Sequence, residues 1–239
     1  MTENRIPTTP YATASPTALG VKPDARLQAA FLSHAFLWMF AGLLVSGAVA
    51  FVVQQNDKLV QFASGNFFLL FIAQLAIVMV ISAGIRKISA TAALALFFVY
   101  AASLGITIGL IVASYTTASV VTAFVSASAM FGAAAIYGAV TKRQLAGMGG
   151  YLFMGVIGLL VAMLLSLVFP SGPLTFVVSI IGVVIFTALT AYDVQRIQAG
   201  DLAAQTGSIE KAAVMGALRL YLDFINLFLF MLRLLGGRA

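Results

Sequence analysis

Cysteine is absent from this chain and histidine occurs once, at position 34. Without cysteine the chain forms no disulfide, no thiolate metal site and no cysteine nucleophile. A single histidine also excludes the histidine-rich zinc arrangements, including the HExxH signature. The sequence contains no Gly-rich phosphate loop and no Ser/His nucleophile arrangement. We therefore expect neither an enzyme of a soluble type nor a bound cofactor.

Charged residues are also scarce, at 8% of the 239 residues, whereas 62% are hydrophobic. Soluble domains usually carry about a quarter of charged residues. This composition is typical of a protein that lies in a lipid bilayer. The net charge of +6 comes from Lys and Arg scattered at the ends of apolar stretches rather than clustered. This scatter favours anchoring at membrane edges over binding to nucleic acid.

The first 25 residues differ from the rest of the chain. They are rich in Pro, Thr, Ala and Ser and show no helical periodicity, which predicts a disordered tail over 1–25. The tail lacks the charged start, apolar stretch and cleavage site of a signal peptide, so we expect the first apolar segment to insert uncleaved. Residues 26–239 are predicted to form a single membrane domain.

Seven apolar stretches are long enough for a helix of about 20 residues to cross the hydrocarbon core. They cover approximately 29–53, 67–85, 90–114, 119–140, 150–169, 173–192 and 213–235. Short links between them favour antiparallel neighbours, so the predicted fold is an all-α bundle of seven transmembrane helices. Gly105 and Gly109 form a GxxxG pattern in the third stretch. We interpret it as close helix packing inside a monomer rather than as a dimer interface.

Positive charges lie in the tail and in the links that follow the second, fourth and sixth stretches. The positive-inside rule therefore predicts a cytoplasmic N-terminus. Seven spans then place the C-terminus on the opposite side. Arg233 and Arg238 near the C-terminus argue against that side, and a re-entrant last helix is the alternative.

The last apolar stretch carries polar residues where lipid does not tolerate them. In LRLYLDFINLFLFMLRLLGG, which covers 218–237, Asp223 has Arg219 one turn before it and Asn226 one turn after it. At 100° per residue these three share one helix face. A carboxylate in hydrocarbon costs about 2.5–3.5 kcal/mol on insertion scales, so this face must meet protein or water. Asp223 therefore requires a buried partner.

Asp193 and Arg86 are the candidate partners. Asp193 closes the sixth stretch in FTALTAYDVQRI, with Thr190 one turn earlier, and Arg86 closes the second stretch in VISAGIRK. If the even-numbered links are cytoplasmic, Asp193, Asp223 and Arg86 lie at a similar depth. Two carboxylates in contact cannot easily both ionise, so they share a proton, and an adjacent guanidinium competes for a carboxylate. This arrangement predicts a pH-sensitive latch.

The alternative is purely structural. In that interpretation Asp193 caps the end of its helix or pairs with Arg196, and Asp223 pairs with Arg219 on its own helix. Agreement in depth does not prove contact, so both interpretations stay open at this point.

The segments AYDVQRI around Asp193 and LYLDFINLFLFMLRLLG around Asp223 resemble the last two helices of the Bax inhibitor-1 (transmembrane Bax inhibitor motif) family. Bacterial members are seven-helix membrane proteins, which implies the inner membrane. The resemblance implies a pH-dependent calcium leak gated by Asp193 and Asp223, with Arg86 as an alternative partner. Two carboxylates would hold Ca²⁺ only transiently, as a leak requires.

The same resemblance carries a second implication and one departure. Some bacterial relatives bind and restrain a membrane-anchored ATP-dependent quality-control protease, so the alternative function is a modulator that transports nothing. Some relatives also have an acidic residue in the second helix, where this chain has only Gln74 and apolar neighbours. A second carboxylate along the path is therefore not expected.

Other membrane functions fit the sequence poorly. Intramembrane aspartyl proteases place their second aspartate after Gly-x-Gly, whereas here Tyr221 and Leu222 precede Asp223. A retinal protein needs a lysine deep in the seventh helix, and Lys211 lies only at its start. His34 is interpreted as a packing or headgroup residue rather than as a second proton sensor.

Overall fold

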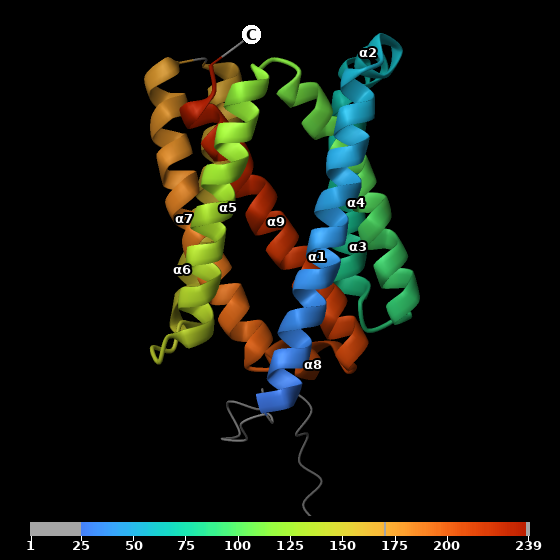
Figure 1. Cartoon of the computed structure of the whole chain (residues 1–239), viewed down its shortest axis with the longest axis vertical. Helices are drawn as coiled ribbons and strands as arrows, with labels where there is room; N and C mark the ends of the chain where they lie inside the picture. The colour runs from blue at the N-terminus through green and yellow to red at the C-terminus, as the bar shows by residue number, and fades with distance from the viewer. Residues whose placement is uncertain (1–24, 170, 238–239) are drawn as a thin grey trace, which may run out of the picture.

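Long α-helices make up nearly all of the computed structural model, which describes residues 25–169 and 171–237 (Figure 1). No strand occurs among these residues. Residues 1–24 of the predicted tail lie outside the described part of the chain. The helices are α1 (Ala25–Gln54), α2 (Asp57–Gly65), α3 (Phe67–Gly84), α4 (Ala90–Val112), α5 (Thr117–Val140), α6 (Gly149–Val168), α7 (Gly172–Gln198), α8 (Asp201–Thr206) and α9 (Ile209–Leu235), with a 3₁₀ turn η2 (Ala146–Met148) before α6.

Seven helices in the described part of the chain are long and apolar enough to cross a membrane, namely α1, α3, α4, α5, α6, α7 and α9. This confirms the predicted all-α bundle and its seven spans. The outward faces of these helices carry large apolar side chains such as Phe68, Val140 and Tyr151. Lipid tolerates such a surface because the side chains are apolar and the backbone groups within the spans are hydrogen-bonded inside the helices.

Two short helices interrupt the predicted links. Asn56 caps α2, since its side-chain oxygen accepts from the backbone N–H groups of Lys58 and Leu59. The other, α8, lies between Gly200 and Gly207, which both have φ of 77°. Glycine reaches this left-handed conformation without steric cost. The chain therefore turns sharply at both ends of α8, and α7 and α9 meet near this turn.

The ends of α7 and α9 differ from the predicted boundaries. Helix α7 continues to Gln198 rather than ending near 192, and α9 begins at Ile209 rather than at 213. Ser208 caps α9 by accepting from the N–H of Lys211. Hydropathy marks where the apolar run stops, whereas a polar helix turn can continue past it. Asp193 therefore lies inside α7 and does not cap its end.

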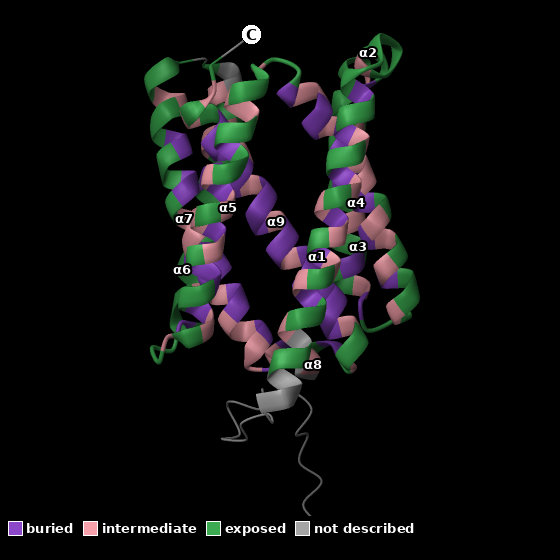
Figure 2. Ribbon diagram, viewed as in Figure 1, coloured by how far each residue is buried: buried purple, intermediate pink, exposed green. Residues whose placement is uncertain are grey.

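Helix α9 is the centre of the bundle. It runs obliquely between the other helices in Figure 1 and contacts α1, α4, α5, α7 and α8. Burial follows this position, because 78% of its membrane window is buried, against 39% or less for the other spans. Figure 2 shows α9 as the mainly buried helix in the interior, with exposed residues on the surrounding helices. A side chain on α9 is therefore surrounded by protein.

Helices α1 and α4 approach closely at the GxxxG pattern. A Cβ atom on Gly105 would lie 2.7 Å from the backbone oxygen of Ser46, and one on Gly109 would lie 2.8 Å from that of Ala50. Only glycine fits these positions unless the helices separate. The pattern thus packs against α1 of the same chain.

The last helix is continuous from Ile209 to Leu235. Its 27 residues span about 40 Å at 1.5 Å per residue. It ends at the opposite end of the bundle from the start of α1 (Figure 1). This is the arrangement that an odd number of spans requires, and the re-entrant alternative for the last helix is wrong.

Candidate functional site

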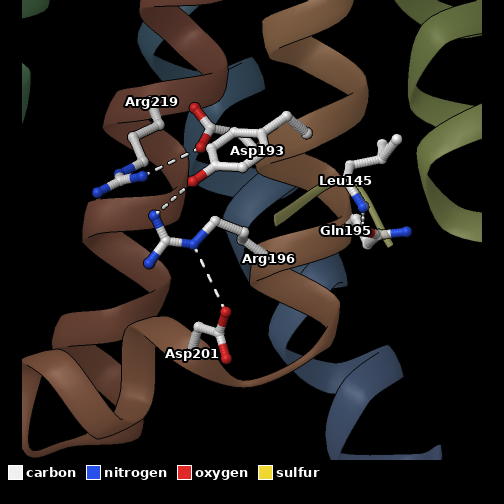
Figure 3. Close-up of polar contacts among 7 residues, drawn as sticks. Leu145, Asp193, Gln195, Arg196, Asp201 and Arg219 are labelled. Carbon is white, nitrogen blue, oxygen red and sulfur yellow. Dashed lines mark hydrogen bonds and ion pairs between the residues drawn. The ribbon is translucent and has the colours of Figure 1, made fainter. Parts of the chain in front are cut away.

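Asp193 of α7 and Arg219 of α9 form an ion pair between the two helices (Figure 3). The Nη1 group of Arg219 donates to Oδ1 of Asp193 at 3.0 Å. The Asp193 side chain is 9% exposed and the Arg219 side chain is 31% exposed. Arg219 thus pairs across helices, and the alternative in which it pairs with Asp223 on its own helix does not occur in the structure.

Asp223 lies one turn beyond Arg219 and is 4% exposed. Its Oδ2 atom is buried without a hydrogen-bond partner among the described residues. The charged groups that act on Asp223 are Asp193 and Arg219. No hydrogen bond joins the two carboxylates, so their relationship is electrostatic. We call Asp193, Arg219 and Asp223 the acid–arginine cluster.

The acid–arginine cluster holds two acids and one directly paired cation. A buried charged oxygen without a hydrogen-bond donor loses its hydration, and no protein hydrogen bond offsets that cost. Arg219 compensates the charge of Asp193, whereas Oδ2 of Asp223 has no donor among the described residues. Like charges at close range disfavour the doubly ionised state further.

Arg196 lies one turn after the cluster on α7 but binds elsewhere. Its Nε is 3.5 Å from Oδ2 of Asp201, and its Nη1 donates to the hydroxyl of Tyr192 at 3.1 Å (Figure 3). Arg196 still contributes positive potential at Asp193. The predicted alternative of a direct Asp193–Arg196 pair is therefore replaced by the pair with Arg219.

Arg86, the third predicted gate residue, does not bind either carboxylate in this structure. Its Nε donates to the backbone oxygen of Gln205 at 2.7 Å, and its own carbonyl accepts from Nζ of Lys211 at 3.2 Å. These bonds hold α8 and the start of α9 beside the end of α3. Arg86 and Arg219 nevertheless line one cavity of about 250 Å³.

The two predicted supporting residues bond within their own helices. The hydroxyl of Thr190 donates to the carbonyl of Phe186 at 2.8 Å, and Nδ2 of Asn226 donates to the carbonyl of Leu222 at 2.8 Å. Such local bonds satisfy a polar side chain inside an apolar helix. Neither residue donates to a carboxylate of the acid–arginine cluster.

A buried polar contact that the sequence analysis missed joins α1, α4 and α9. The hydroxyls of Tyr221 and Ser46 lie 2.6 Å apart, and Ser46 also donates to the carbonyl of Ala101 at 2.7 Å. Tyr221 is fully buried and packs edge-on against Phe97 and Tyr100. The one available signal was Tyr221 itself, a hydroxyl in an otherwise apolar run that needs a partner when buried.

Gln195 was also missed as a structural residue. Its Oε1 accepts from the N–H of Leu145 at 2.7 Å (Figure 3). Its Nε2 donates to the carbonyl of Arg143 at 2.8 Å. The side chain thus fastens the segment before α6 to α7, next to the acid–arginine cluster. Helix α7, which carries Asp193, is thus bonded to the segment before α6 through Gln195 and to α9 through the Asp193–Arg219 pair.

Metal ligands are sparse at this site. The described residues contain no group of three or more His, Cys, Asp and Glu side chains that could hold a metal ion. Asp193 and Asp223 together offer fewer oxygens than the six to eight that Ca²⁺ prefers.

Comparison with known proteins settles the family. The family model described as inhibitor of apoptosis-promoting Bax1 matches residues 28–239. The chain belongs to the Bax inhibitor-1 family. The match includes all seven spans of this Bax inhibitor-1 protein and its acid–arginine cluster, and it confirms the resemblance seen in the last two helices.

Bacterial relatives of this Bax inhibitor-1 protein match over nearly their whole length. It is 42% identical to the inner membrane protein YbhL of Escherichia coli K12 over 226 residues, which cover 91% of this chain and 95% of YbhL. An uncharacterized protein of Borreliella burgdorferi is 40% identical over 222 residues, covering 91% and 96% of the two chains. Protein RP147 of Rickettsia prowazekii is 34% identical over 211 residues, covering 87% and 89%.

Proposed function

We propose that this protein is a pH-sensitive calcium leak of the bacterial inner membrane, and that the structure is its closed state. The observation that carries the proposal is the acid–arginine cluster on the central helix. It links α9 to α7 through a single ion pair and leaves one buried carboxylate oxygen without a donor. A change in protonation therefore acts directly on the contact between these helices.

Acidification weakens this contact by one route. When Asp193 takes up a proton it loses its charge, and the ion pair with Arg219 becomes a weaker hydrogen bond from the charged guanidinium to a neutral carboxyl group. Helices α7 and α9 remain packed through apolar side chains but lose their charged link. The closed packing is less favoured, and α9 is freer to move.

Alkaline conditions weaken it by another route. When Asp223 loses its proton, a second negative charge appears beside Asp193 with Arg219 as the single paired cation. Its Oδ2 has no donor in this packing. The closed state is therefore most stable when the two acids hold one proton between them, and the leak rises on either side of that state.

The path is blocked in the closed state by a buried part of α9. Leu218 lines the cavity of about 250 Å³ beside Arg86, and Ile225 lines a second cavity of about 260 Å³ between α1, α4 and α5. Tyr221 lies on the same face of α9 between these two residues and is fully buried. Movement of α9 away from α7 would displace Tyr221 and open the second cavity toward the acid–arginine cluster, so the path does not run through the cavity beside Arg86.

The transported ion needs weak sites along such a path. Tight binding would hold the ion, and two carboxylates without further oxygen ligands bind Ca²⁺ only briefly. We infer a cytoplasmic location for this end of the bundle from the positive charges near the start of α1 and around α8, which the positive-inside rule favours on that side. The name of the relative YbhL supports the inner membrane as the location.

Reconstitution tests the proposal. Purified protein is placed in phosphatidylcholine liposomes that contain a calcium indicator, and Ca²⁺ entry is followed against protein-free liposomes. We expect Ca²⁺ entry that depends on protein and on pH. Absence of entry at every pH, together with co-purification of a membrane-anchored ATP-dependent protease, would favour the alternative of a modulator that transports nothing.

A further inference from the structure

The cavity between α3, α8 and α9 is positively charged. Two guanidinium groups line it, Arg86 from the end of α3 and Arg219 from α9. The remaining polar lining comes from Ser82, Gln205 and Thr206, and no acidic side chain of the described residues is part of the wall. A cavity of about 250 Å³ with two cations and no acid in its wall is suited to an anion.

The guanidinium of Arg86 has N–H donors beyond the one that binds Gln205. Its Nε is used on the backbone oxygen of Gln205, and the described residues supply no acid within ion-pair distance of its guanidinium. Lys211 adds a third positive charge nearby, because its Nζ donates to the carbonyl of Arg86 at 3.2 Å. The exposed acid on the same turn, Glu210, accepts from Ser208 instead. Neither Arg86 nor Lys211 forms an ion pair with an acid of the described residues.

We propose that this cavity binds a phosphate group, carried either by an anionic lipid headgroup or by free inorganic phosphate. The planar donors of arginine match phosphate oxygens in pairs, which gives such contacts both strength and direction. Gln205 and Thr206 add polar groups to the same wall. The cavity is lined by the end of α3, by α8 and by the first part of α9. The end of α3, α8 and the start of α9 lie at the end of the bundle where α1 begins (Figure 1), which the positive-inside rule places at the cytoplasmic headgroups.

The site has a regulatory consequence, which rests on the proposed function. Arg219 lines the cavity and also pairs with Asp193. A phosphate bound at Arg86 competes with Asp193 for the guanidinium of Arg219. Occupancy weakens the ion pair between α7 and α9 and raises the leak, so the ligand shifts the population toward the open state.

Binding is measured without reference to flux. The full chain in phosphatidylcholine nanodiscs is titrated with inorganic phosphate by phosphorus NMR, and in detergent its retention of phosphatidylglycerol is followed by native mass spectrometry. We expect Arg86→Gln to weaken binding about tenfold or more, as loss of a charge-assisted hydrogen bond implies. Lys87→Gln is the matched control, because Lys87 is the next residue and does not line the cavity. Its binding should stay unchanged.

Ser82→Glu is the second test variant. Ser82 is an exposed residue of α3 that lines the cavity, so the change adds a carboxylate to the wall. It should abolish binding even if Arg86→Gln proves poorly folded. Binding that survives both changes, or that falls equally in Lys87→Gln, overturns the site. Competition by inorganic phosphate assigns a free anion, and retention of phosphatidylglycerol that phosphate does not displace assigns a lipid.

The regulatory step is tested separately. Calcium entry is compared in phosphatidylcholine liposomes with and without phosphatidylglycerol, or with and without phosphate. We expect the anion to raise entry in wild-type protein and in Lys87→Gln but not in Ser82→Glu. Specific binding without any effect on a measurable leak contradicts the regulation. Specific binding with no leak under any condition contradicts the proposed function and leaves the phosphate site in place.

Discussion

Arg219 of α9 and Asp193 of α7, 26 residues apart in the sequence, are joined by a 3.0 Å ion pair at the contact between the two helices. The pair is asymmetric, because the carboxylate is almost buried while the guanidinium reaches the cavity beside Arg86. Arg219 therefore contacts both the cavity and the buried acid of α7.

Arg219→Gln is expected to lower the free energy of unfolding by about 1–2 kcal/mol. The value lies below that of a fully buried pair because the guanidinium is partly exposed. Titration with sodium dodecyl sulfate in mixed micelles measures it. Arg233→Gln is the matched control at the other end of α9, where the guanidinium lies over Phe230 and forms no ion pair with a described residue. An equal loss in both variants would argue against a special role for the pair.

Gly105→Ala is expected to destabilise the protein by about 1–3 kcal/mol, since the new methyl group would meet the backbone of α1 at Ser46. Helices α1 and α4 cannot separate there without losing packing along their length. Gly132→Ala provides the comparison, because nothing lies within 4 Å of the added atom. Thermal unfolding in detergent should show a lower midpoint for Gly105→Ala alone. Equal midpoints for the two variants would mean that the close approach is dispensable.

The Ser46–Tyr221 contact predicts unequal effects of its two deletions. Tyr221→Phe should cost about 1 kcal/mol, because Ser46 keeps its bond to the carbonyl of Ala101. Ser46→Ala should cost more, about 1–3 kcal/mol, since it leaves the fully buried hydroxyl of Tyr221 without a partner. Unfolding in mixed micelles compares the two variants and their double mutant. A larger loss in Tyr221→Phe than in Ser46→Ala would contradict this assignment.

The sequence was sufficient to predict the seven spans and the burial of Asp223. Both follow from the cost of polar groups in hydrocarbon, which composition reveals directly. The depth argument also placed Asp193 and the residues around Asp223 at one level. It did not predict that Arg219 pairs with Asp193 of α7 rather than with Asp223 of its own helix. This pairing depends on how α7 and α9 are rotated about their axes, which is set by packing.

Other features could not be read from the sequence for similar reasons. Helix α8 depends on two left-handed glycines whose conformation is decided by the tertiary fold. Ser46 has the pattern of a serine that bonds within its own helix, because its hydroxyl lies 3.0 Å from the carbonyl of Gly42, but it also lies 2.7 Å from the carbonyl of Ala101 on α4. The role of Arg86 at α8, rather than at a carboxylate, likewise follows from the position of Gln205 in a turn that hydropathy does not reveal.

The pH profile of calcium entry shows whether Asp193 and Asp223 gate the leak. Entry into phosphatidylcholine liposomes is recorded from acid to alkaline pH for the wild type, Asp223→Asn and Asp193→Asn. We expect wild-type calcium entry to be lowest at an intermediate pH and to rise at both lower and higher pH. Asp223→Asn should lose the alkaline rise because it cannot ionise, and it should keep the acid rise because the Asp193–Arg219 pair remains. An Asp223→Asn profile that superimposes on the wild-type profile would show that ionisation of Asp223 does not open the leak.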